Sequence, residues 1–286
     1  MKKLFIVALT LTFVQLGAFA QKWVKKSPGT QILQITIGQD GTTWALDINK
    51  SVLKWDGKKW EATNKGDSLN QISCGSAAHC WGVASNGQVY NWKVKAWAQP
   101  NLSDFLKQIV VSPNGTVWGL RSSDFQVLKW NGTKWMEKNA ADKMVTLYIG
   151  ADGTPWGLDK EGQVWKWVST KWVQTTPGTI LKQLAVANTN VAWGIDGTGQ
   201  VMKFDAGKWI PANPGDKAKY IAVSMVGSGN LAKANVWMIG LDGQVGKWDG
   251  SRWAKTNEGD KMKELFLGSD GSVWGIDDNN QACKFE

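Results

Sequence analysis

The stretch that decides the fold is GTVWGL at residues 115–120, because close variants of it return along the whole chain. Residues 271–276 read GSVWGI, and five other places carry a tryptophan in the same setting. Together these tryptophans form a column: Trp44, Trp81, Trp118, Trp156, Trp193, Trp237 and Trp274. A fixed period of roughly 20 to 50 residues is typical of solenoids, propellers and arrays.

Two more aromatic columns follow the same period. One opens each unit: Trp23, Trp60, Trp97, Trp135, Trp172, Trp209 and Trp253. The other closes each unit: Trp55, Trp92, Trp130, Trp167, Phe204, Trp248 and Phe285. The openers are 37, 37, 38, 37, 37 and 44 residues apart, so seven units fill residues 21–286 and we expect one domain there. Aromatic residues repeated inside strands predict wedges packed between units, with sugar-stacking platforms as the alternative.

Each unit predicts four short strands separated by turn signals. In the second unit we expect them at residues 70–74, 80–83, 88–92 and 96–98, lettered A to D from inner to outer. Asn-Gly and Asp-Gly pairs between the strands, such as Asn86-Gly87, accept the positive φ of tight hairpins. No stretch has an apolar period of 3.6 residues, so we expect little helix.

The two ends of the chain complement each other. The chain starts with a lone D strand at residues 21–25 and finishes with A, B and C strands at 265–285. Pairing them completes a seventh blade and removes an exposed sheet edge. The sequence therefore predicts an all-β, seven-bladed β-propeller of four-stranded antiparallel blades. The alternative, an open solenoid, leaves these end strands unpaired. The longer sixth unit places its extra residues in an A-to-B loop at 227–234.

The first twenty residues predict a secretory signal peptide. Lys2 and Lys3 precede an apolar stretch that ends on Ala18-Phe19-Ala20. We therefore expect a secreted or periplasmic protein without an integral membrane segment.

Removing the two signal lysines leaves 31 basic residues against 24 acidic ones, a surplus that favours anionic partners such as phosphorylated glycolipids. The lysines are spread over all units, which argues against nucleic acid.

The three cysteines predict one disulfide. Cys74 and Cys80 flank a short hairpin loop and occupy columns that are otherwise apolar and expected to be buried. An oxidising compartment would join them, and two packed thiols are the alternative. Cys283 is expected to be a buried thiol outside any disulfide.

The repeated unit, with Trp-x-x-x-Asn-x-Gly-Asp, Gly-x-Val-Trp-Gly-Leu-Asp and Gly-Gln-Val-x-Lys-Trp, resembles the tectonin repeat. That repeat occurs in β-propeller lectins of the tachylectin-like and fish egg lectin-like group. The resemblance covers residues 22–286. It implies glycan or lipopolysaccharide binding at several similar sites, without catalysis or a cofactor. The family often closes with six repeats whereas this chain has seven, so the number of binding sites is not carried over.

The D-to-A connections carry the candidate ligand-binding residues, because loops on a rigid scaffold commonly bear the site. The first column there is Ser27, Asn64, Asn101, Asn139, Thr176, Asn213 and Asn257. The second column, three residues later, is Thr30, Asp67, Asp104, Asp142, Thr179, Asp216 and Asp260. In the five Asn–Asp units an amide and a carboxylate would grip adjacent sugar hydroxyls. Turn capping is the alternative, and it explains the joint variation of the two columns equally well.

Trp165 is the one tryptophan outside the columns, so it is a further candidate for stacking on a ligand, with peripheral packing as the alternative. An enzyme is not expected. His79 is the only histidine and lies in a hairpin loop, no zinc or calcium motif is present, and no acidic cluster interrupts the repeat.

These observations predict an exported, monomeric, multivalent lectin for surface glycans or lipopolysaccharide, with no metal. The alternative is a non-catalytic propeller scaffold that binds a protein at the cell envelope.

Overall fold

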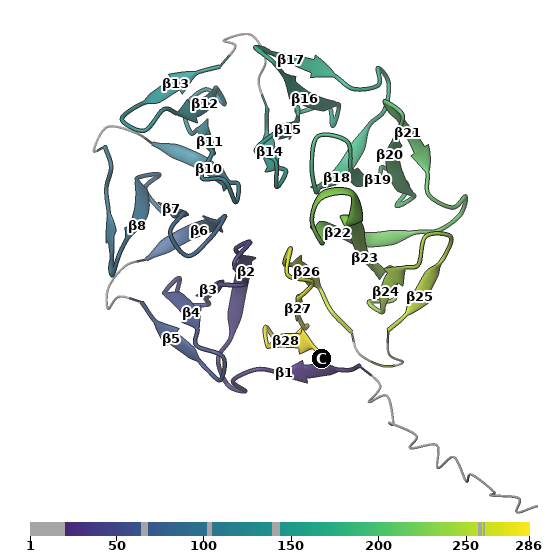
Figure 1. Cartoon of the computed structure of the whole chain (residues 1–286), viewed down its shortest axis with the longest axis horizontal. Helices are drawn as coiled ribbons and strands as arrows, with labels where there is room; N and C mark the ends of the chain where they lie inside the picture. Colours follow the sequence, from purple (N-terminus) through teal and green to yellow (C-terminus); the bar gives the residue numbers. More distant parts are fainter. Residues whose placement is uncertain (1–20, 64–67, 102–104, 139–143, 257–258, 260) are drawn as a thin grey trace, which may run out of the picture.

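A computed structural model describes residues 21–63, 68–101, 105–138, 144–256, 259 and 261–286. It contains seven four-stranded antiparallel sheets arranged as the blades of a ring (Figure 1). The only helical element in the described ranges is a single 3₁₀ turn, η1 (Gly229–Leu231). The predicted all-β, seven-bladed propeller is confirmed.

Every blade runs from an inner A strand to an outer D strand. The A strands are β2 (Ile32–Ile37), β6 (Leu69–Cys74), β10 (Leu106–Val111), β14 (Thr146–Ile149), β18 (Leu181–Val186), β22 (Ala218–Val226) and β26 (Glu264–Leu267). The B strands are β3 (Thr43–Asp47), β7 (Cys80–Ala84), β11 (Val117–Arg121), β15 (Pro155–Leu158), β19 (Ala192–Asp196), β23 (Lys233–Gly240) and β27 (Val273–Ile276). We number the blades 1 to 7 in the order of these A strands.

The two outer positions are filled by shorter strands. The C strands are β4 (Val52–Trp55), β8 (Val89–Lys93), β12 (Val127–Trp130), β16 (Val164–Val168), β20 (Val201–Asp205), β24 (Val245–Trp248) and β28 (Ala282–Phe285). The D strands are β5 (Trp60–Ala62), β9 (Ala96–Ala98), β13 (Trp135–Glu137), β17 (Lys171–Gln174), β21 (Lys208–Pro211), β25 (Trp253–Lys255) and, closing blade 7, β1 (Trp23–Lys25). In blade 2 all four strands lie within one residue of the predicted bounds.

The ring closes through blade 7, where the N-terminal strand β1 pairs with the C-terminal strand β28. Trp23 lies opposite Phe285, and the N–H of Glu286 donates to the carbonyl of Lys22 at 2.9 Å. Lys26 and Glu286 add an ion pair at 2.7 Å. The first and last strands of the chain therefore lie side by side, as predicted (Figure 1).

The extra residues of the sixth unit are used differently from the prediction. Only residues 227–232 form the loop that contains η1, because β22 and β23 continue to pair as far as Val226 opposite Lys233. The antiparallel ladder can extend at its open hairpin end, where the added residues satisfy each other's backbone groups. Lys233 and Ala234, predicted in the loop, therefore belong to strand β23.

The three aromatic columns meet in triads between neighbouring blades, which confirms their structural role. Trp44 of blade 1, for example, contacts Trp92 and Trp97 of blade 2 with ring centroids 5.1 and 6.1 Å apart. The edge-to-face geometry of these rings is the arrangement that aromatic pairs favour. Every blade junction has such a triad, and the second-column tryptophans are buried in all seven blades.

Glutamines on the A strands join the blades near the central channel. The Gln71 amide donates to the carbonyl of Ile109 and accepts from its N–H, both at 2.8 Å. It thereby pairs with the next blade's inner strand much as a backbone group would. Gln34, Gln108 and Gln183 make the same two bonds to the blade that follows each of them. This glutamine column was not predicted from the sequence.

The glycine of each Trp-Gly pair leaves room for a large residue at the start of the A strand. A Cβ on Gly194 would lie 2.4 Å from the Leu181 side chain and 2.9 Å from the Gln183 carbonyl oxygen. Blade 1 has Ala45 with Ile32 at these two places; isoleucine has the volume of leucine, so a different side-chain shape accommodates the added Cβ.

Gly194→Ala is therefore expected to destabilise the protein by about 1–3 kcal/mol, because the core at Leu181 is already filled. Urea unfolding followed by circular dichroism measures the loss. Adding Leu181→Ile to the Gly194→Ala variant reproduces the Ala45 and Ile32 pair of blade 1 and should recover part of the lost stability. A midpoint unchanged by the single substitution would contradict this packing argument.

Candidate functional site

Each D-to-A connection runs from the outer rim back to the inner strand of the next blade (Figure 1). In three described connections the N–H of the second-column residue donates to the carbonyl of the first-column residue: Thr30 to Ser27, Thr179 to Thr176, and Asp216 to Asn213, at 3.1–3.2 Å. A Pro-Gly pair lies between them, and each of these glycines has a positive φ of 86–96°. The turn is of the kind in which glycine supplies the left-handed conformation.

The first-column side chains bond to the C-to-D turn region of the following blade. Asn213 Nδ2 donates to the carbonyl of Ser251 at 3.2 Å, and Thr176 Oγ1 donates to the carbonyl of Gly207 at 3.4 Å. Ser27 Oγ accepts from the N–H of Trp60 at 3.4 Å. In all three cases the side chain joins two blades at the rim. This is a structural role, although it differs from the local capping that was the alternative.

A glutamine at the start of a C strand holds the same turn from within its blade. Gln200 Nε2 donates to the carbonyl of Asn213 at 2.8 Å, and its Oε1 accepts from the N–H of Gly215 at 2.8 Å. Gln281 likewise accepts from the N–H of Gly29 at 3.0 Å. The side chain of Asp216 is half-exposed beside this turn. The recurring Gly-Gln-Val motif was visible in the sequence, but its role required the tertiary contact.

The other candidates in these loops are distributed as follows. Asn101 is half-buried at the end of a described range. Asn64, Asp67, Asp104, Asn139, Asp142, Asn257 and Asp260 lie outside the described residues. Ligand binding by these two columns stays a prediction.

Asn213→Ala should lower stability by about 0.5–1.5 kcal/mol, because it removes the inter-blade hydrogen bond to Ser251. Differential scanning calorimetry measures the change. Asp216→Ala is the matched comparison in the same turn and should leave the melting temperature nearly unchanged. Equal melting temperatures for Asn213→Ala and the natural protein would argue against the joining role.

Trp165 lies on β16 and is half-exposed. Its indole Nε1 donates to the Asp159 carboxylate at 2.8 Å, and its ring packs on the cluster of Trp118, Met144 and Trp172. These contacts match the packing alternative, while stacking on a ligand stays a prediction.

The grooves between blades repeat a lysine placed over a tryptophan. Lys54, Lys129, Lys166, Lys247 and Lys284 each hold their ammonium 5.1–5.9 Å from the ring centroid of the second-column tryptophan in their own blade. Such a cation over an indole face is attracted by the ring quadrupole. Of these five, only Lys284 has a carboxylate within 4 Å in the described part of the chain.

Lys166 shows how the groove affects these cations. Desolvation between blades 4 and 5 lowers the pKa of its ammonium, and the charge of Asp152 opposes that effect. Its Nζ also donates to the carbonyl of Thr189 at 3.2 Å. In blade 2 the lysine is replaced by Asn91. This exception is visible in the sequence as the one repeat without Lys before the closing aromatic residue, although it was not among the predicted site residues.

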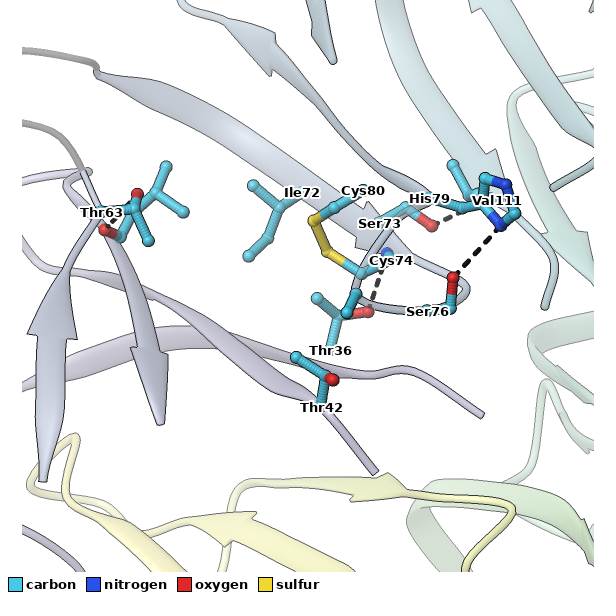
Figure 2. The surroundings of a disulfide bond; sticks show 12 residues. Thr36, Thr42, Thr63, Ile72, Ser73, Cys74, Ser76, His79, Cys80 and Val111 are labelled. Carbon is cyan, nitrogen blue, oxygen red and sulfur yellow. Dashed lines mark hydrogen bonds between the residues drawn. A yellow bond between two sulfur atoms is a disulfide. The ribbon is translucent and has the colours of Figure 1, made fainter. Parts of the chain in front are cut away.

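Cys74 and Cys80 lie directly opposite each other at the end of the β6–β7 hairpin and are joined in a disulfide (Figure 2). The N–H of Cys74 donates to Thr36 Oγ1 of blade 1 at 3.1 Å. Ser73 Oγ accepts from the N–H of Val111 of blade 3 at 2.9 Å. The disulfide therefore belongs to a strand that is bonded to both neighbours. Cys283 is buried, as expected.

The column that contains Cys74 lines one end of the central channel. There it borders a cavity of about 250 Å³ to which every blade contributes. Cys74 and Val111 are buried, but the remaining members are half-exposed: Ile37, Ile149, Val186, Val223 and Leu267. The prediction of a fully buried column is wrong for these five, because no side chain fills the axis of the ring at this end.

Among the described residues, no helical segment has the length and apolar character needed to cross a membrane. Within the same ranges, no three His, Cys, Asp or Glu side chains come together in a way that would hold a metal ion.

Comparison with known proteins places the chain in a repeat family. The family model described as "Tectonin domain" matches residues 31–132 and 106–225. No curated protein matches the chain. Among solved structures, a streptogramin B lyase is 15% identical, with 93% of this chain and 97% of that chain covered and a TM-score of 0.66. YCF48 from Cyanidioschyzon merolae is 13% identical, with coverages of 92% and 98% and a TM-score of 0.66.

The WD40 propeller domain of Doa1 is 12% identical, with 92% of this chain and 95% of that chain covered and a TM-score of 0.66. Similarities at such identities show the propeller fold alone.

Proposed function

Since this chain belongs to the tectonin family of repeat proteins, we propose that it is an exported, multivalent carbohydrate-binding protein that recognises surface glycans or lipopolysaccharide. The observation that carries the proposal is the recurrence of one groove around the ring. Five described grooves each present a lysine ammonium over an indole, and four of these cations lack a carboxylate within 4 Å among the described residues.

Such a groove suits an anionic sugar or a sugar phosphate. Lys54 and Lys129 are half-exposed, so their ammonium groups are accessible while their stems pack on the protein. Each groove by itself would bind weakly. Several equivalent grooves on one rigid ring would combine by avidity on a dense glycan surface. The basic surplus of the chain supports an anionic target.

Export is supported by the predicted signal peptide and by the Cys74–Cys80 disulfide, because disulfides persist in oxidising compartments.

The proposal includes no catalytic step and no metal, and it describes a monomeric protein. Catalysis by a streptogramin B lyase is a property of that protein, and an identity of 15% does not transfer it.

Binding of the purified protein to a glycan and lipopolysaccharide array, at low and high salt, tests the proposal. Binding that persists in salt and is competed by a defined free sugar would support specific pockets. Binding that salt abolishes would mean general charge attraction. An array without signal would favour the alternative, a scaffold for a protein partner.

A matched pair of triple variants separates the grooves from net charge. Lys54→Gln, Lys129→Gln and Lys247→Gln together remove three groove cations. Lys58→Gln, Lys134→Gln and Lys171→Gln together remove three exposed lysines near the rim turns. The proposal expects the groove variant to lose at least about tenfold more avidity for lipopolysaccharide than the rim variant. Equal losses would contradict the groove assignment.

A further inference from the structure

The groove between blades 2 and 3 departs from the repeat. Asn91 of β8 lies opposite Trp81 of β7, where six other blades carry a lysine. The shorter side chain places no ammonium over this indole. Trp81 is accordingly 6% exposed, whereas its six counterparts are 0–3% exposed. One groove in the ring therefore has no lysine at its centre, and its tryptophan, though buried, is slightly more exposed than its counterparts.

The space beside Asn91 is a groove of about 710 Å³. Its size falls within the roughly 300–1,000 Å³ of small-molecule sites. Both blades contribute to its walls, with the following prominent side chains: His79, Trp81 and Asn91 from blade 2, and Asn114, Trp130 and Asn131 from blade 3. Two lysines also border the groove. Lys93 is exposed at the end of β8, and the Lys129 ammonium lies 5.5 Å from the ring centroid of Trp118, which belongs to the next blade junction.

The amide of Asn91 lacks a partner that the protein would be expected to supply. Its residue is only 7% exposed, and its Oδ1 is buried without a hydrogen bond. Buried polar atoms in proteins are nearly always paired. Several buried indole N–H groups of the described triads share this lack, but the Asn91 oxygen belongs to a side chain on the wall of a groove, where a ligand can supply the partner. An amide both donates and accepts, as a sugar hydroxyl does.

We propose that this groove binds one neutral pyranose residue of a glycan, with Asn91 bonding a hydroxyl and the accessible parts of the Trp81 and Trp130 rings contacting the apolar C–H face. The inference rests on the proposed carbohydrate function and gives one groove a ligand class different from that of the lysine-bearing grooves. The absence of the groove cation is the reason that the ligand is neutral. Binding here would not depend on salt, because no charge at the centre of the groove is screened.

Isothermal titration calorimetry in high salt tests the site. The probes are the methyl glycosides of glucose, galactose, mannose and N-acetylglucosamine. We expect one of them to bind the natural protein at a single site. Asn91→Lys restores the residue of the other blades, fills the groove and should weaken this binding at least about tenfold. Its melting temperature should hold, because the lysine gains the same position over Trp81 that its counterparts have.

A second variant and a control complete the test. Asn91→Leu keeps a similar volume without the amide, and it should also lose sugar binding. Lys58→Asn changes an exposed rim lysine outside every groove and should leave the affinity of the Asn91 site unchanged. Natural affinity in both Asn91 variants, or no binding of any probe by the natural protein, would overturn the proposal. The glycan and lipopolysaccharide array reports separately on multivalent binding of anionic glycans. A silent array together with intact glycoside binding would reject the proposal for the lysine-bearing grooves and leave the Asn91 site standing.

Discussion

Replacing Trp118 with alanine is expected to lower the free energy of unfolding by about 3–5 kcal/mol, the cost of removing a large aromatic side chain from a packed core. Trp118 is 1% exposed, and its ring centroid lies 5.3 Å from that of Trp167 and 6.2 Å from that of Trp172 in blade 4. The change therefore leaves a cavity between two blades, which the rigid sheets can fill only in part. Urea denaturation followed by tryptophan fluorescence and circular dichroism measures the loss.

Trp165→Ala is the matched comparison on the neighbouring blade. Trp165 is half-exposed and belongs to no triad, so its removal should cost clearly less. If both variants unfolded at the same urea concentration as the natural protein, the triads would not be the main junctions between blades. A large loss for Trp165 alone would lead to the same conclusion.

Removing residues 21–25 is expected to have an effect at least as large. This deletion takes away β1, which completes blade 7, and with it Trp23, whose ring lies 5.3 Å from Phe285 and 6.2 Å from Trp237. Strand β28 would then present an unpaired edge, which is a known route to aggregation. We expect a loss of more than about 3 kcal/mol and a lower monomer fraction in size-exclusion chromatography.

A peptide of residues 21–27 added to the shortened protein should restore part of the stability, because it supplies the missing strand and Trp23. The control is the protein that starts at residue 21, which keeps β1. Identical unfolding of the shortened and control proteins would mean that the strand pairing contributes little. A stability loss that the peptide does not reverse would point to some other effect of the deletion.

The position of Asn91 is a departure from the repeat. Six blades have a lysine at this position, and in five of them its ammonium lies over the indole. In a repetitive scaffold the residue shared by all units is usually needed for packing, as the triads show. The asparagine is confined to one unit and is not required by the fold, which is why we propose for this groove a ligand distinct from that of the recurring lysine grooves.

Several properties could be derived from the sequence alone. The tryptophan columns and the Asn-Gly and Asp-Gly turns determine the strands, the number of blades and the closure of the ring, because strand pairing within a blade is local and each unit repeats the same pattern. The positions of Cys74 and Cys80 on either side of one hairpin also predicted the disulfide that joins them in the structure.

Only the tertiary structure decided what the side chains between blades do. Asn213 was a candidate sugar ligand in the sequence, yet its amide bonds to Ser251 of the next blade. Gln71 pairs with Ile109 about forty residues away, and the open groove at Asn91 depends on how blade 3 stands against blade 2. The physical reason is that repeat periodicity specifies each blade along the chain, whereas contacts between blades depend on the twist and spacing of two sheets, which no local pattern encodes.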